Sequence, residues 1–234
     1  MKNEVMDDYY TSQKSKLLKD FDKTVRKYGR KILVRHYGDA LADTILKEGR
    51  QEFEVLIPEL PYIGGKKNPW TNILIQCTGF LALYRVLKAH GKTVEEAGRM
   101  AYELAEAQLL SYPKLLRRLI GRWSFTRYKL NKLRRQAAAS QKRLYPEDWV
   151  LSFVQGDGKE FDYGMDITEC AICKFFHAQG ADELTPFGCL TDFAMSKALG
   201  LGLVRTMTIA EGAEKCDFRF KRGRETQQGW SPSS

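Results

Sequence analysis

The stretch WVLSFVQGDGKEFDYGMDITEC, from Trp149 to Cys170, decides how this chain is expected to fold. Its first residues, Trp149 to Val154, are rich in aromatic and β-branched side chains, which are typical of strands. Gly156-Asp157-Gly158 follows as a turn, and Phe161 to Met165 supplies a returning strand. The stretch therefore predicts a β-hairpin that begins at Trp149.

The residues after the hairpin predict two helices and then two further strands. Ile167 to Gln179 and Thr185 to Leu199 have helical spacing, whereas Val204 to Ala210 and Cys216 to Phe220 alternate as strands do. The order β-β-α-α-β-β favours an antiparallel sheet with two helices on one side. The fold class expected for this region is therefore α+β.

Upstream of Trp149 the apolar residues recur at helical spacing instead. The helices are expected near Asp7 to Tyr28, onward to Leu56 with a break at Gly38-Asp39, over Trp70 to His90, and over Thr93 to Ser111. The predicted architecture is a helical N-terminal half (residues 1–145) packed on a C-terminal α+β module (residues 146–223). A flexible tail is expected over residues 224–234.

The composition predicts a globular protein of a reducing compartment. Of 234 residues, 43% are hydrophobic and 29% are charged, which suffices for a buried core. The longest apolar run, Ile73 to Leu87, contains Gln76 and Arg85 and is too short to span a bilayer. The five cysteines show no disulfide framework, and the N-terminus has no apolar signal core, so we expect a cytoplasmic location.

The net charge of +9 originates in one segment. Between Ser111 and Val150 there are 11 Lys and Arg residues against 2 Asp and Glu. Three interpretations stay open: a solvated helix face, a cationic wall over an acidic substrate, or a surface for nucleic acid or membrane. No zinc-finger or RRM-type signature is present, so nucleic acid is not the expected partner.

Three cysteines of the C-terminal region lie close to carboxylates, and this repeated pairing indicates a site. Such pairs suit a reaction in which a thiol attacks carbon while a carboxylate orients the substrate or activates water. The pairs are Cys170 with Glu169, Cys189 with Asp192, and Cys216 with Asp217.

A thiol attacks carbon only as the thiolate, which a helix N-terminus favours. Cys189 is the first candidate, because it is expected to open a helix and has Asp192 one turn further on to orient a substrate amino or amidine group. Cys170 and Cys216 are its rivals, and Glu169 or Glu211 is the expected activator of water. Cys216 and Asp217 are candidate substrate contacts, although alternation places them on opposite faces of their strand.

Two other roles for the thiols stay open. Cys170, Cys173, Cys189 and Cys216 would suffice for tetrahedral zinc, but their gaps are irregular and a second C-x-x-C is missing. Cysteine is also a common buried residue, so the four could be inert parts of a core. We expect no cofactor and keep zinc as the alternative.

Several fragments together resemble the L-2-amino-thiazoline-4-carboxylic acid hydrolase family: ECAICKFF, CLTD and the closing RTMTIAEG and CDFRF. Further upstream, PYIGG and SQKRLYPEDWV resemble the longer form of this family. The resemblance implies hydrolysis of a C–N bond in a small cyclic amidine that carries a carboxylate, giving a carbamoylated cysteine. Arg205 is the expected partner of that carboxylate, since arginine can bind it with two bonds. The competing function is a non-catalytic small-molecule binding or sensor module, and homo-oligomerisation stays open.

Overall fold

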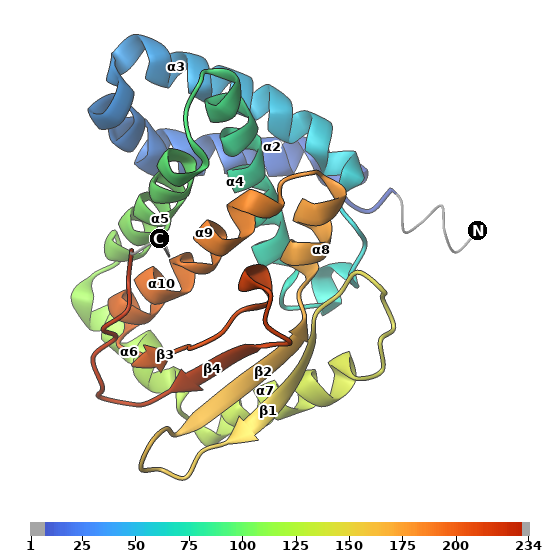
Figure 1. Ribbon diagram of the computed structural model, residues 1–234, viewed down its shortest axis with the longest axis vertical. Coiled ribbons are helices and arrows are strands. Elements are labelled where there is room, and N and C mark those ends of the chain that lie inside the picture. The colour runs from blue at the N-terminus through green and yellow to red at the C-terminus, as the bar shows by residue number, and fades with distance from the viewer. Residues whose placement is uncertain (1–7, 231–234) are drawn as a thin grey trace. The chain divides into compact units, whose positions relative to one another are not determined.

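A computed structural model describes residues 8–230 of the chain (Figure 1). The chain divides into two compact units. Among the described residues, one unit contains residues 8–104 together with Lys174–Gly188, and the other contains Ala105–Cys173 and residues 189–230. The units interleave along the chain, and the domain boundaries expected near residues 145 and 223 remain predictions.

The first unit is helical, as its apolar spacing predicts. The first helix was expected to end at Tyr28, but a π-helical turn there leads directly into the next helix. Asp7, its expected start, lies outside the described residues. The break expected at Gly38 is confirmed by its φ of 79°. The helices are α2 (Lys14–Thr24), the π-helical turn (Val25–Gly29), α3 (Arg30–Leu56), α4 (Thr71–Ala89) and α5 (Val94–Leu110), which continues into the second unit.

Aromatic stacking and close backbone approach hold the first unit together. Phe21 of α2 stacks on Phe53 of α3, with ring centroids 4.8 Å apart. Gly49 of α3 faces Leu83 of α4 so closely that a Cβ at this glycine would lie 2.7 Å from the leucine side chain. A side chain at residue 49 would therefore require the end of the Leu83 side chain to shift.

The second unit is built on a four-stranded antiparallel sheet (Figure 1). Its strands lie in the order β1-β2-β4-β3, and the expected α+β class is confirmed. The chain between β2 and β3 forms three helices instead of two, because the expected second helix is divided between Cys189 and Thr191. The strands are β1 (Val150–Gln155), β2 (Tyr163–Glu169), β3 (Leu203–Val204) and β4 (Cys216–Phe220), and the helices between β2 and β3 are α8 (Ala171–Ala178), α9 (Thr185–Cys189) and α10 (Thr191–Leu199). Most of α8 and α9 belongs to the first unit, which contains Lys174–Gly188.

One face of the sheet carries the apolar residues. Phe153, Met165 and Phe218 are paired across β1, β2 and β4, so their side chains share a face. Arg134 lies over the Phe153 ring, and Arg205 lies over the Phe218 ring. Cys216 lies on this face too, whereas Asp217 pairs with Asp166 on the opposite one.

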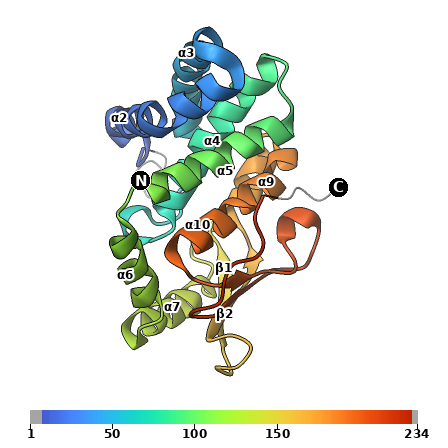
Figure 2. The ribbon, with the colours of Figure 1, turned by 90° about the vertical axis from the view of Figure 1, so that its left-hand side faces the viewer.

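Two helices of the basic segment precede the sheet (Figure 2). They are α6 (Lys114–Ser124) and α7 (Arg127–Ser140). Helix α7 is joined to β1 by Ser140, whose hydroxyl accepts from the Leu151 N–H at 3.1 Å and donates to the Leu151 carbonyl at 3.1 Å. The helix thereby satisfies backbone groups of an edge strand.

The C-terminal segment has defined partners where a flexible tail was expected. The Thr226 hydroxyl lies 2.6 Å from that of Ser196, and both residues are buried. Gln228 accepts from the Arg205 N–H at 3.2 Å and donates to the Arg205 carbonyl at 2.8 Å. Residues 231–234 of the expected tail lie outside the described residues. Among residues 8–230, no helix is both long and apolar enough to cross a membrane.

Candidate functional site

Cys170 lies where β2 ends and α8 begins. β2 stops at Glu169 and α8 starts at Ala171, so Cys170 is in the position that caps the helix. The N–H groups of Ile172 and Cys173 donate to its sulfur. These donors are among the four that every helix leaves without an internal partner.

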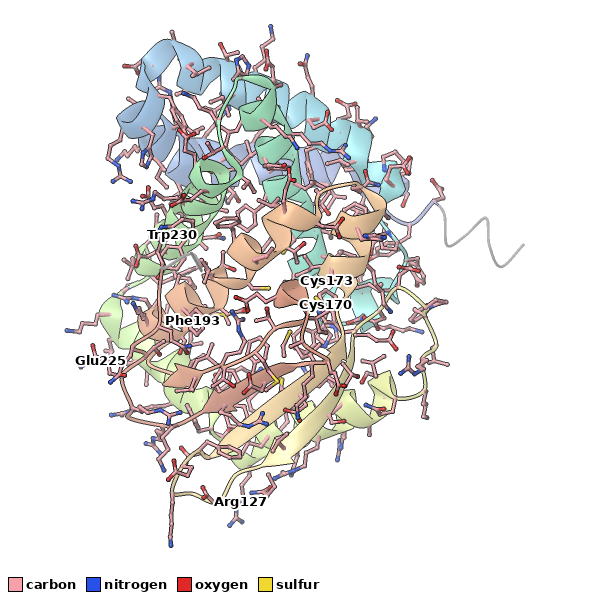
Figure 3. All side chains as sticks on the ribbon, viewed as in Figure 1. Arg127, Cys170, Cys173, Phe193, Glu225 and Trp230 are labelled. Atoms are coloured by element: carbon pink, nitrogen blue, oxygen red, sulfur yellow. The ribbon has the colours of Figure 1, made fainter. Side chains whose placement is uncertain are left out.

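The second cysteine of the C-x-x-C pair, Cys173, also favours a negative charge on the Cys170 sulfur. The Cys173 thiol donates to the Cys170 sulfur, and this bond, with the backbone donors and the Trp149 indole N–H, lowers the pKa of Cys170 against the opposing effect of burial. The same bond, together with burial, raises the pKa of Cys173. Cys170 is therefore the residue that becomes a thiolate, and Cys173 keeps its proton. Figure 3 shows the two residues beside each other at the start of α8.

Cys189 does not occupy the helix N-terminus expected for it. It is the last residue of α9, a helix of five residues, and α10 begins two residues later. Burial raises the pKa of Cys189 well above its usual value, and Asp192 adds to this effect while Arg205 opposes it. The argument that a helix start favours its thiolate is therefore wrong, and it applies to Cys170 instead.

Asp192 and Arg205 form an ion pair beside Cys189, in which the arginine is buried and the aspartate is partly exposed. The Arg205 Nη1 lies 2.7 Å from the Asp192 Oδ2, and its Nη2 donates to the Cys189 carbonyl at 3.1 Å. The guanidinium carbon lies 4.8 Å from the centre of the Phe193 ring and 5.1 Å from that of Phe218. Burial raises the pKa of Asp192, and the arginine opposes this rise.

The strand expected to carry Arg205 is shorter than its alternating pattern suggests. β3 contains only Leu203–Val204, so Arg205 follows the strand instead of lying in it. Beyond β3, Asp217 of β4 accepts from the N–H groups of Thr206 and Met207, each at 2.8 Å. The Asp217 carboxylate therefore binds the backbone of the segment that follows Arg205.

Cys216 faces the apolar side of the sheet and accepts from the Ile209 N–H at 3.3 Å. Burial raises its pKa. Glu211 lies on the same turn, where it accepts from the Thr208 hydroxyl at 2.6 Å. Glu211 therefore follows, by two residues, Ile209, whose N–H donates to Cys216.

The acidic residues of β2 are paired with cations. Glu169 forms an ion pair with Arg143. Asp166 lies 2.5 Å from the Lys215 Nζ and 2.8 Å from the Arg219 Nη2. Burial acts to raise the pKa of Asp166, but the hydrogen bonds from these two cations lower it overall.

The sequence candidates thus divide into a central group and an outer group. Within the second unit, the four thiols are close enough to influence one another's ionisation, and Asp192 and Arg205 act on Cys189 and Cys216. Asp217 is on the other face of the sheet from Cys216. The central group, called the thiol cluster below, consists of Cys170, Cys173, Cys189, Cys216, Asp192 and Arg205.

Metal binding finds no support in the described part of the chain. Among residues 8–230, no group of three or more His, Cys, Asp or Glu side chains is arranged to hold a metal ion. The Cys170 sulfur instead accepts hydrogen bonds from the thiol and the N–H of Cys173.

Residues 73–220 match the family model described as L-2-amino-thiazoline-4-carboxylic acid hydrolase. The chain belongs to this family. The match begins in α4, ends at the last residue of β4 and contains every member of the thiol cluster. Searches of curated proteins and of solved structures give no match.

Sequence reasoning missed two members of the site. Cys173 had been weighed only as a zinc ligand or core residue, although its spacing from Cys170 is the one that lets an N3 residue face an N-cap. Trp149 had been treated only as part of a strand, yet its indole N–H donates to Cys170. The role of Cys173 could have been found from the C-x-x-C spacing at a helix start. The role of Trp149 depends on a tertiary contact.

Proposed function

We propose that the protein is a hydrolase that opens a C–N bond in a small cyclic amidine carrying a carboxylate. The substrate class follows from the family's name, with 2-amino-thiazoline-4-carboxylate as the reference compound. One observation carries the mechanism: Cys170 precedes the first residue of α8 and its sulfur accepts from the N–H groups of Ile172 and Cys173, whereas Cys189 ends α9 and Cys216 lies in a strand. In keeping with this geometry, the pKa of Cys170 is lowered, while the pKa values of Cys189 and Cys216 are raised, chiefly by burial. Cys170 is the nucleophile of the proposal.

In the first half-reaction the Cys170 sulfur attacks the amidine carbon. The ring C–N bond then breaks, and the leaving nitrogen takes one proton from the Cys173 thiol and one from the exocyclic nitrogen. The amidine carbon stays bound to Cys170, doubly bonded to the exocyclic nitrogen and singly bonded to the substrate sulfur. A proton donor in contact with the nucleophile assists this step because an amine leaves poorly without protonation.

In the second half-reaction water adds to the same carbon. Its hydroxyl joins the carbon, its proton goes to the exocyclic nitrogen, and collapse of the adduct expels the Cys170 thiolate. The proton released from the hydroxyl returns to Cys173, so one water is consumed and both thiols are restored. Glu211 and Glu169 are the candidate bases, and the product bears its carbamoyl group on sulfur.

Arg205 is the candidate partner of the substrate carboxylate. A guanidinium has five N–H donors, and Asp192 with the Cys189 carbonyl engages Nη1 and Nη2. The remaining donors could bind a second carboxylate, while Asp192 could accept from the amidine nitrogen. Arg205→Lys keeps the positive charge but loses the planar set of N–H donors of the guanidinium, so KM should rise with little change in kcat. An unchanged KM would remove Arg205 from the binding site.

The mechanism also requires a reducing compartment, since a disulfide between Cys170 and Cys173 would remove the nucleophile. All five cysteines are free thiols in the structure. A cytoplasmic location, where such thiols stay reduced, is part of the proposal.

One observation favours the competing function, a non-catalytic binding module. The Arg205 side chain is only 3% exposed and already has an acidic partner, as a structural ion pair would. In that case Cys170 would bind or sense a ligand without turning it over. Turnover of the reference compound by the purified chain distinguishes the two functions.

The test of the proposal compares two substitutions of one type. Cys170→Ser removes the sulfur nucleophile and should lower kcat about a thousandfold or more. Cys77→Ser is the matched control, because Cys77 lies in α4 and outside the thiol cluster. Near wild-type turnover by a folded Cys170→Ser variant would refute the proposed mechanism.

A further inference from the structure

Helix α6 exposes its apolar side chains. Leu115 is 70% exposed, Leu119 is 52% exposed and Trp123 is 48% exposed, and Leu116 and Ile120 between them are exposed as well. Large apolar side chains exposed next to one another in this way usually mark a surface that binds something. We call these five residues the apolar stripe.

The stripe is exposed because α6 packs through its other side. A Cβ at Gly121 would lie 1.9 Å from the Leu199 carbonyl oxygen, and Arg117 donates to the Ala198 carbonyl at 3.1 Å. Gly121 and Arg117 therefore face the end of α10. With 3.6 residues per turn, the stripe lies on the opposite side of α6 from these two residues.

Cations border the stripe. Arg118 and Arg122 follow it along one flank of α6, and both are exposed. Beyond the helix, the Lys129 ammonium lies 4.1 Å from the centre of the Trp123 ring, which stacks on the exposed Tyr128 with centroids 6.5 Å apart. No Asp or Glu occurs from Ser111 to Pro146.

This arrangement has the features of a helix that lies in a membrane interface. Such helices bury leucine and tryptophan at the boundary of the acyl chains and direct lysine and arginine to anionic headgroups. Aromatic side chains with one polar edge favour the same depth. We propose that the apolar stripe of α6 and its flanking cations bind the surface of an anionic lipid bilayer.

Two other occupants fit the observations less well. A second copy of the chain would bring one strongly basic stripe against another, and like charges oppose such pairing. Nucleic acid would use the cations but would leave five apolar side chains without a partner. An anionic bilayer uses both features of the segment.

The test is co-sedimentation of the full chain with vesicles. Phosphatidylcholine vesicles that contain phosphatidylglycerol should bind the protein, and pure phosphatidylcholine should bind it at least about tenfold more weakly. Leu119→Ser and Trp123→Ser should each weaken binding about tenfold, because each removes apolar area that would enter the bilayer. The matched control is Val55→Ser, which changes an apolar residue of α3 that is 61% exposed and should leave binding unchanged.

Each alternative outcome would overturn the proposal. These outcomes are no sedimentation with either vesicle, or binding that the two α6 substitutions leave intact. A concentration-dependent dimer that Leu119→Ser abolishes, without vesicle binding, would assign the stripe to a second copy. Binding to duplex RNA or DNA that responds to Arg118→Gln but not to Leu119→Ser would assign the cations to nucleic acid.

Discussion

Cys173 donates the hydrogen of its thiol to the sulfur of Cys170, so the two cysteines of one C-x-x-C have opposite tendencies. The pKa of Cys170 is lowered and that of Cys173 is raised, because the proton stays on the residue one turn inside the helix. Cys170 and Cys173 are three residues apart at the start of α8. They can therefore act as a nucleophile and its proton donor.

Removal of the donor should shift the pH dependence of the reaction. The nucleophile acts as a thiolate, so kcat/KM rises with pH through the pKa of Cys170, which lies below that of an ordinary thiol. Cys173→Ala removes the first of the causes that lower this pKa, and the rising limb should move to higher pH by about one unit. The pH profile of Cys77→Ala is the control. An unmoved limb would separate Cys173 from the ionisation of Cys170.

The ion pair between Arg205 and Asp192 should be costly to break from one side. Arg205→Met leaves the partly buried Asp192 carboxylate without its cation, which should lower the free energy of unfolding by about 1–3 kcal/mol. Urea denaturation measures the loss. The loss of unfolding free energy caused by Arg205→Met should become smaller as pH falls through the raised pKa of Asp192, because the protonated acid is neutral and tolerates partial burial. A loss that stays constant with pH would contradict this account of the pair.

Gly121 should be intolerant of any side chain. Gly121→Ala directs a methyl group into the Leu199 carbonyl oxygen, and either α6 or the end of α10 must move. We expect a loss of about 1–3 kcal/mol in thermal or urea unfolding. Gly188→Ala in α9 is the matched control, because a Cβ there meets no atom within 4 Å. Equal stability of the two variants would refute the close approach.

The C-terminal segment should contribute to stability through Gln228. Gln228→Ala removes both hydrogen bonds to the Arg205 backbone and should cost about 1 kcal/mol. Gln227→Ala changes the exposed neighbouring residue and is the matched control. If the two variants unfold at the same urea concentration, the segment behaves as the flexible tail that its sequence suggests.

Local features of the fold could be predicted from the sequence, because they depend on neighbouring residues. The alternation of Cys216, Phe218 and Phe220 identified a strand and its apolar face. Thr93 and Glu96 have the spacing of a capping box, and they make the two reciprocal bonds of that motif at 2.8 and 3.1 Å. These patterns involve residues that lie close together in the chain, so they can be recognised in the sequence alone.

The candidate site was harder to predict, since it is assembled from distant residues. The start of α9 at Thr185 was anticipated from Pro186, but nothing local shows that the helix ends after one turn. Cys189 was therefore placed at a helix start when it lies at an end. The pairing of Asp192 with Arg205 joins α10 to the residue after β3, and the sequence does not encode that contact by spacing.

The central claim, that Cys170 carries the nucleophilic thiolate, is tested most directly by site-resolved alkylation. The folded wild-type chain is treated with iodoacetamide over a range of pH, and each cysteine is quantified by peptide mass spectrometry. We predict that Cys170 reacts first and at a pH below the usual range of thiols, and that Cys189 and Cys216 react later. Faster alkylation of Cys189 at low pH, with Cys170 unmodified, would contradict the account.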